Sequence, residues 1–98
     1  MNYQISVKAN EDIEAIWLYT FENWGQEQAD RYYNLILNEI EYIAENFESG
    51  KSMEFLRKGY RATKVKSHLI FYRKNKKNTV EIIRILHQKM DIENRLVE

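Results

Sequence analysis

The chain contains no cysteine and no proline, and it has only three glycines and two histidines among its 98 residues. Without cysteine there is no disulfide, no thiolate nucleophile and no zinc–thiolate site. Two histidines with no cysteine also argue against a metal site. We therefore expect neither a metal ion nor a cofactor. The scarcity of proline and glycine leaves few structural breaks, and Gly25, Gly50 and Gly59 mark the expected boundaries of helices and strands.

Long hydrophobic runs are absent as well. No apolar segment approaches the roughly 20 residues that a membrane-spanning helix needs. Residues 1–12 also lack the apolar core of a signal peptide. We therefore expect a cytoplasmic protein with no membrane contact. Hydrophobic residues still make up 44% of the chain and aromatic residues 13%, which is enough for one compact domain over residues 1–98.

The two halves of the chain carry opposite charge. Residues 1–50 hold ten acidic and two basic side chains, a net charge of −8, whereas residues 51–98 hold five and thirteen, a net charge of +8. This asymmetry predicts a basic surface that faces an acidic partner. Because the acidic first half would be repelled by a phosphate backbone, we expect a protein partner and no direct binding of nucleic acid.

The first half has the apolar periodicity of one strand and two helices. Residues 3–7 alternate between apolar and polar side chains, as in a short strand with one buried face. Asn10 is the expected N-cap of a first helix that stops near Gly25 and carries acidic residues in its first turn. A second helix is expected from Gln26 to just before Ser49. Two amphipathic helices with so short a joint predict an antiparallel hairpin.

The second half predicts three strands, over residues 60–65, 68–74 and 79–87, after a connecting loop at 51–58. Their short polar connections indicate an antiparallel meander. Asp91 is expected to cap a final short helix. The predicted fold is therefore α+β, in the order β-α-α-β-β-β, with the N-terminal helical hairpin packed on a small, mainly antiparallel sheet.

Specific short motifs are spread along almost the whole chain. They are Ala9 with the following acids and residues 13–19, Trp24-Gly25 with Gln28-Ala29 and Tyr33, Gly50-Lys51-Ser52, Arg57 with Gly59-Tyr60-Arg61, and above all HLIFYR at 68–73 and IIRILHQKMD at 82–91. In this order and at this spacing, they resemble the ParE branch of the RelE/ParE superfamily of bacterial toxins.

The resemblance implies the toxin of a type II toxin–antitoxin system. Such a toxin forms a hetero-oligomer with a cognate antitoxin, here expected to be ParD-like with an acidic tail. ParE-like toxins characteristically inhibit DNA gyrase, whereas RelE-like relatives share the fold and cut messenger RNA on the ribosome. We expect a non-catalytic gyrase inhibitor, with a ribosome-dependent endonuclease as the alternative. Residues 11–47 and 88–98 are the candidate target surfaces.

The alternative function needs a general base, a general acid and cations around one phosphate. The candidates are Arg61, Tyr72, Arg73, Arg84 and His87, of which Arg61, Arg84 and His87 would form the catalytic set. On a regular strand His87 shares a face with Ile83 and Ile85, and Arg84 points to the opposite face. Unless a bulge intervenes, Arg84 and His87 therefore do not form a catalytic pair. The preferred interpretation is that His87 ends the last strand and anchors the following turn by hydrogen bonding.

Three arginines are the best candidates for binding the antitoxin. Arg57, Arg61 and Arg73 belong to the basic half, and an arginine side chain can hold a carboxylate with two parallel hydrogen bonds. The lysines around residues 74–77 are expected to matter less, because exposed ion pairs contribute only about 0–1 kcal/mol. The competing interpretation is that these charges form a solvated surface and bind nothing.

Overall fold

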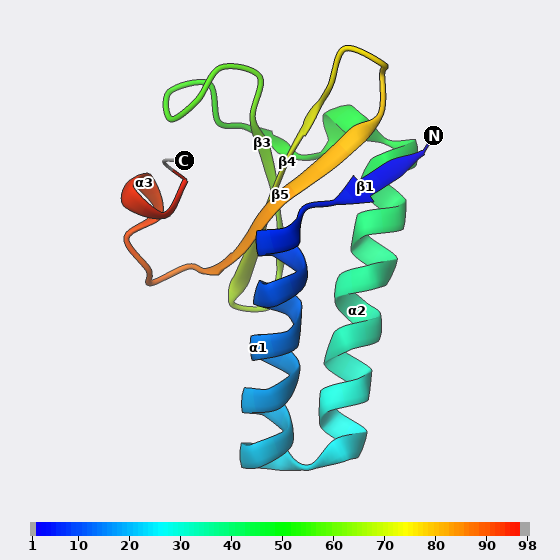
Figure 1. Ribbon diagram of the computed structural model, residues 1–98, viewed down its shortest axis with the longest axis vertical. Helices are drawn as coiled ribbons and strands as arrows, with labels where there is room; N and C mark the ends of the chain where they lie inside the picture. The colour runs from blue at the N-terminus through cyan, green and yellow to red at the C-terminus, as the bar shows by residue number, and fades with distance from the viewer. Residues whose placement is uncertain (1, 97–98) are drawn as a thin grey trace.

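The computed structural model describes residues 2–96 and shows a helical hairpin packed against a five-stranded sheet (Figure 1). The elements are β1 (Tyr3–Ile5), α1 (Val7–Trp24), α2 (Gln26–Glu45), the 3-10 helix η1 (Phe47–Ser49), β2 (Lys51–Ser52), β3 (Arg61–Val65), β4 (His68–Lys74), β5 (Val80–His87) and α3 (Ile92–Arg95). The predicted α+β fold is confirmed. No helix within the described residues is long and apolar enough to cross a membrane.

The strands lie in the order β1-β5-β4-β3-β2. β1 pairs in parallel with β5, and the other neighbours are antiparallel. The first strand of the chain therefore lies beside the last, as Figure 1 shows at the N-terminus. The segment predicted as a loop at 51–58 contains the edge strand β2. This strand has only two residues, so it is too short to show an alternating pattern.

Helix α1 begins earlier than the sequence predicts. Ser6 is its N-cap and accepts a hydrogen bond from the Ala9 N–H at 3.0 Å, so Val7 is helical and Asn10 lies inside the helix. The first turn consequently contains no acidic residue. Ser6 and Asn10 are both good capping residues, but only Ser6 also donates its hydroxyl proton to the Ile83 carbonyl of β5, at 2.8 Å. This contact to the sheet fixes the start of α1.

The sheet has a hydrophobic core on each face. The larger core lies under the hairpin and contains Ala9, Ile13, Ile36, Ile40, Ile43, Val65, Ile70, Tyr72, Val80, Ile82 and Ile85. The smaller core on the opposite face contains Tyr60, Ala62, Phe71, Ile83, Leu86 and Leu96. Met53 and Leu56 of the connecting loop and Ile92 of α3 pack against the smaller core. The segment after β5 thus covers the chain's own sheet.

A bulge interrupts β5. Tyr72 of β4 pairs with Ile82, while the preceding Phe71 pairs with Arg84, which leaves Ile83 without an opposite residue. The extra residue reverses the alternation of faces. Ile83 therefore packs in the smaller core, whereas Ile85 packs under the hairpin. The expectation that Ile83 and Ile85 share a face was wrong, because it assumed a regular strand.

Truncation of Ile70 or Leu86 tests both cores. Ile70 lies in the larger core and Leu86 in the smaller one, and both are essentially inaccessible to solvent. We expect each change to alanine to lower the free energy of unfolding by about 2–5 kcal/mol. Leu18→Ala is the control, because that side chain is 51% exposed and its loss should cost less than about 0.5 kcal/mol. Denaturant unfolding measures all three, and wild-type midpoints for Ile70→Ala and Leu86→Ala would contradict the core assignment.

Candidate functional site

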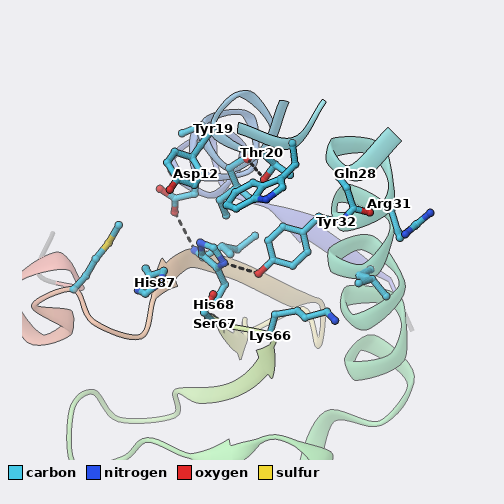
Figure 2. A pocket seen from close by; sticks show the side chains of 16 residues that line it. Asp12, Tyr19, Thr20, Gln28, Arg31, Tyr32, Lys66, Ser67, His68 and His87 are labelled. Carbon is cyan, nitrogen blue, oxygen red and sulfur yellow. Dashed lines mark hydrogen bonds between the residues drawn. The ribbon is translucent and has the colours of Figure 1, made fainter. Parts of the chain in front are cut away.

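A groove of about 800 Å³ lies between the hairpin and the ends of β4 and β5 (Figure 2). It exists because the hairpin extends past the turn between β3 and β4, so that part of its sheet-facing side stays uncovered (Figure 1). The apolar wall is formed mainly by Ile16, Tyr19, Trp24, Leu35, Ile85 and Met90. Arg31 and Lys66 also line the groove and are exposed, and Arg31 pairs with Glu27 at 3.2 Å. This arrangement suits a ligand with apolar side chains and acidic flanks.

The polar floor of the groove is built from Tyr32, His68 and His87. His68 and His87 are paired across β4 and β5, with ring centroids 5.3 Å apart and planes at 85°. The Tyr32 hydroxyl lies 2.6 Å from His68 Nδ1 and 3.0 Å from the Val65 carbonyl oxygen (Figure 2). Burial lowers the pKa of His68, the neighbouring His87 lowers it further, and Asp12 acts in the opposite direction. His68 is therefore neutral near pH 7.

Asp12, which lines the groove on the α1 side, forms an ion pair with Arg84 of β5. Arg84 Nε lies 2.8 Å from Asp12 Oδ2, and Arg84 Nη2 lies 2.9 Å from Asp12 Oδ1. Asp12 Oδ2 also accepts the backbone N–H of Ile85 at 2.9 Å, and Arg84 Nη1 donates to the Arg95 carbonyl at 3.2 Å. Both side chains of the pair are only 14% exposed. The Arg84 guanidinium thus serves to join α1, β5 and α3.

The structure does not assemble the catalytic set proposed for a nuclease. Arg61 faces Tyr72 at one end of β3, whereas Val65 at the other end faces His68, the partner of His87. Arg61 donates to the Glu48 carbonyl at 3.0 Å. The bulge reverses the alternation of faces along β5. Arg84 and His87 nevertheless have different partners, because Arg84 binds Asp12 and His87 contacts His68.

Tyr72 and His87, both candidates for the nuclease, make structural contacts. The buried Tyr72 hydroxyl donates to the Phe47 carbonyl at 2.8 Å and accepts the Gly50 N–H at 3.0 Å, and burial raises its pKa. His87 Nδ1 accepts the Lys89 N–H at 3.1 Å, in the turn after β5. Within residues 2–96, no group of three metal-ligating side chains lies together.

The three arginines predicted to bind the antitoxin fall on two sides of the sheet. Arg57 and Arg73 meet at Tyr60, each with its guanidinium carbon 5.7 Å from the ring centroid. Arg73 also pairs with Glu81 at 2.9 Å, and Arg57 donates to the Leu96 carbonyl at 3.3 Å. Arg61, the residue after Tyr60, points to the other face, where it lies 5.7 Å from the Phe47 ring.

Sequence reasoning missed the groove and the pairing of the two histidines. A regular ladder counted back from the Lys74–Val80 pair would place Leu86 opposite His68, and only the bulge puts His87 there. Tyr32 lies on a helical stripe typical of a core residue, so nothing in its spacing indicates a contact with His68. The one available signal was the short spacer between the strands at 60–65 and 68–74, which predicts that Val65 faces His68.

Comparison with known proteins identifies the family. Residues 3–92 match the family described as "ParE toxin of type II toxin-antitoxin system, parDE". The chain is 44% identical over 89 residues to Toxin ParE1 of Caulobacter vibrioides, covering 91% of each chain. It is 35% identical over 94 residues to Toxin ParE1 of Mycobacterium tuberculosis strain H37Rv, covering 96% of each.

A solved structure shows the same fold. The match is to a chain described as "Chromosomal ParDE TA system from P. aeruginosa", with a TM-score of 0.77 at 21% identity, and it covers 89% of this chain and 95% of that one. Together with the family match over residues 3–92, these likenesses show that the chain belongs to the ParE family of toxins of type II toxin–antitoxin systems.

Proposed function

We propose that this toxin acts in the cytoplasm by binding and inhibiting DNA gyrase, with no catalysis of its own. Gyrase is the target that the ParE resemblance implies. The observation that carries the non-catalytic part is the Asp12–Arg84 ion pair, which commits the arginine closest to His87 in sequence to the fold. Inhibition by binding to a protein does not require a general acid, a general base and a cation placed around one phosphate.

The geometry gives little support to ribonuclease chemistry. Cleavage of RNA without a metal needs a base, an acid and a cation within reach of one phosphate. Here His87 uses Nδ1 to accept the Lys89 N–H. The ring that it contacts belongs to His68, whose pKa is lowered, so that His68 is neutral. Arg61 lies at the far end of β3. The groove floor therefore offers no cation to hold a phosphate.

Of the two candidate target surfaces, the hairpin keeps more exposed apolar area. Leu18, Tyr19, Phe21 and Trp24 of α1 are all more than 40% exposed. The segment after β5, in contrast, places Leu96 and Ile92 against the smaller core. Residues 97 and 98 of the predicted surface lie outside the described residues.

Parallel assays of supercoiling and translation test the proposed target. We expect the purified toxin to inhibit supercoiling by gyrase and to leave cell-free translation unaffected. His87→Ala should retain the inhibition, because His87 has no catalytic partner in the structure, and its melting temperature serves as the control for folding. Arrest of translation with normal supercoiling, or loss of growth arrest in a folded His87→Ala protein, would establish a nuclease instead.

We further propose that the antitoxin is ParD-like and that an acidic segment of it occupies the groove. Membership of a toxin–antitoxin family implies an antitoxin partner. The net charge of +8 on residues 51–98, with Lys66 on the rim of the groove, favours an acidic one. Apolar side chains of the same segment would pack against Tyr19, Trp24 and Leu35. The antitoxin would continue over the basic half of the chain, where Arg57, Arg61 and Arg73 remain the proposed ligands of its carboxylates.

Association kinetics at low and high salt test this electrostatic contribution. We expect the on-rate to fall as salt increases, because salt screens the attraction between the basic half and an acidic segment. Arg61→Ala should weaken binding measurably, whereas Lys76→Ala, at the exposed hairpin tip, should change it by only about 0–1 kcal/mol. Melting temperatures control for the lost bond to Glu48. Salt-independent on-rates together with wild-type affinity in Arg61→Ala would show that the basic half is only a solvated surface.

A further inference from the structure

The chain has two histidines, and the fold brings both to the floor of the groove. They come from adjacent strands and meet edge to face, with ring centroids 5.3 Å apart (Figure 2). Each uses its Nδ1 atom in a hydrogen bond to a neighbour. Within residues 2–96, no hydrogen bond engages either Nε2 atom, so these two atoms are available to a ligand.

The contacts of Tyr32 determine which nitrogen of His68 carries the proton. The hydroxyl has a single proton, and the Val65 carbonyl, at 3.0 Å, can only accept it. The 2.6 Å contact with His68 is then a hydrogen bond only if His68 Nδ1 is protonated and donates to the Tyr32 oxygen. Burial raises the pKa of Tyr32, so the hydroxyl keeps its proton. Neutral His68 therefore presents a lone pair, an acceptor, at Nε2.

His87 has the opposite tautomer. The Lys89 backbone N–H lies 3.1 Å from His87 Nδ1 and can only donate, so Nδ1 must accept. The proton of a neutral His87 is then on Nε2. The floor of the groove thus offers one acceptor, from His68, and one donor, from His87, on rings whose centroids lie 5.3 Å apart.

The primary amide of an Asn or Gln side chain matches this pair, because its carbonyl acceptor and one of its N–H donors lie side by side. A trans backbone peptide group does not, because its C=O and N–H point in opposite directions. A carboxylate has two acceptors and an ammonium group has only donors, so either can satisfy only one histidine. The charged and titratable groups around the pair do not change this preference. Asp12 on α1 is neutralised by Arg84, Arg31 on α2 is bound to Glu27, and Tyr19, Tyr32 and Lys66 complete the surroundings.

We propose that His68 and His87 form a subsite that recognises the side-chain amide of an Asn or Gln in the antitoxin segment that occupies the groove. The identity of the occupant rests on the proposed function, but the donor–acceptor pair does not. The subsite also makes binding depend on pH. Protonation of His68 would turn its acceptor into a donor that faces the amide N–H. Affinity therefore falls as acid protonates His68.

The tautomers can be measured in the toxin without any partner. Nitrogen-15 NMR of the histidine rings near pH 7 should show the proton of His68 on Nδ1 and that of His87 on Nε2. The opposite assignment for either ring would remove the donor–acceptor pair and overturn the proposal.

Asparagine substitutions separate recognition from structural support. The Asn amide occupies the position of Nδ1, so it can preserve the contact with Tyr32 or with Lys89 while it removes Nε2. We expect His68→Asn and His87→Asn each to bind the antitoxin that co-purifies with this toxin roughly tenfold more weakly, the loss of about one hydrogen bond. Melting temperatures should stay close to wild type. Gln reaches the Nε2 position, so His68→Gln and His87→Gln should regain part of the affinity.

The outcomes distinguish the subsite from the proposed function. Wild-type affinity in both Asn variants would overturn the subsite, and so would binding that strengthens between pH 7 and pH 5, which would indicate a carboxylate on protonated histidines. Undiminished binding of an antitoxin variant whose Asn and Gln residues are all replaced by alanine would overturn the subsite as well. Normal gyrase activity in the presence of wild-type toxin would instead contradict the proposed function and leave the subsite unaffected.

Discussion

The Asp12–Arg84 ion pair ties the helical hairpin to the bulged part of the sheet. It joins residues 72 positions apart in the sequence, and it connects α1 to β5 and, through the Arg95 carbonyl, to α3. A largely buried pair of charges is stable only when its remaining hydrogen-bonding groups are satisfied. Here the Ile85 N–H and the Arg95 carbonyl contribute two of these bonds. The pair therefore fixes the position of α1 over the bulged part of the sheet.

The groove follows from that constraint. Ser6 attaches the start of α1 to Ile83, and Asp12 attaches the next turns to Arg84 and Ile85. Beyond these contacts the hairpin continues past the end of the sheet (Figure 1). Apolar side chains on this part of the hairpin line the groove. The same bulge that presents Arg84 to Asp12 also shifts the register so that His87 meets His68. One local irregularity thus shapes both the wall and the floor of the groove.

Local patterns predicted the fold well because they depend on neighbours in the sequence. The strand predicted at 68–74 agrees with β4, and the break at Gly25 separates the two helices as expected. The errors arose where two residues had equivalent local properties and a tertiary contact determined which of them took the structural role. Ser6 and Asn10 could both cap α1, and the contact of Ser6 with Ile83 decided between them. Nothing in the run of isoleucines in β5 indicates which residue is the bulge.

The candidate site was less predictable than the fold for the same reason. Strand alternation accounts for Arg57 and Arg73 approaching Tyr60 while Arg61 points away, although the roles of all three in binding remain predictions. The contacts of Tyr32 with His68 and of Asp12 with Arg84 span 36 and 72 positions, respectively. Neither pair has a motif or a fixed spacing, because the packing of the hairpin on the sheet brings each pair together.

A double-mutant cycle on Asp12 and Arg84 tests most directly whether this pair is structural. Unfolding free energies are measured for wild type, Asp12→Ala, Arg84→Ala and the double variant. We expect each single change to cost about 3–5 kcal/mol, because it leaves a charge in a mostly buried site without its partner. The double variant should lose less than the sum of the two, with a coupling energy of about 1–3 kcal/mol. Losses that add within about 0.5 kcal/mol would show that the two side chains do not stabilise each other. A fully stable Arg84→Ala protein that no longer arrests growth would indicate a catalytic role for Arg84. Either result would contradict a structural role for the pair.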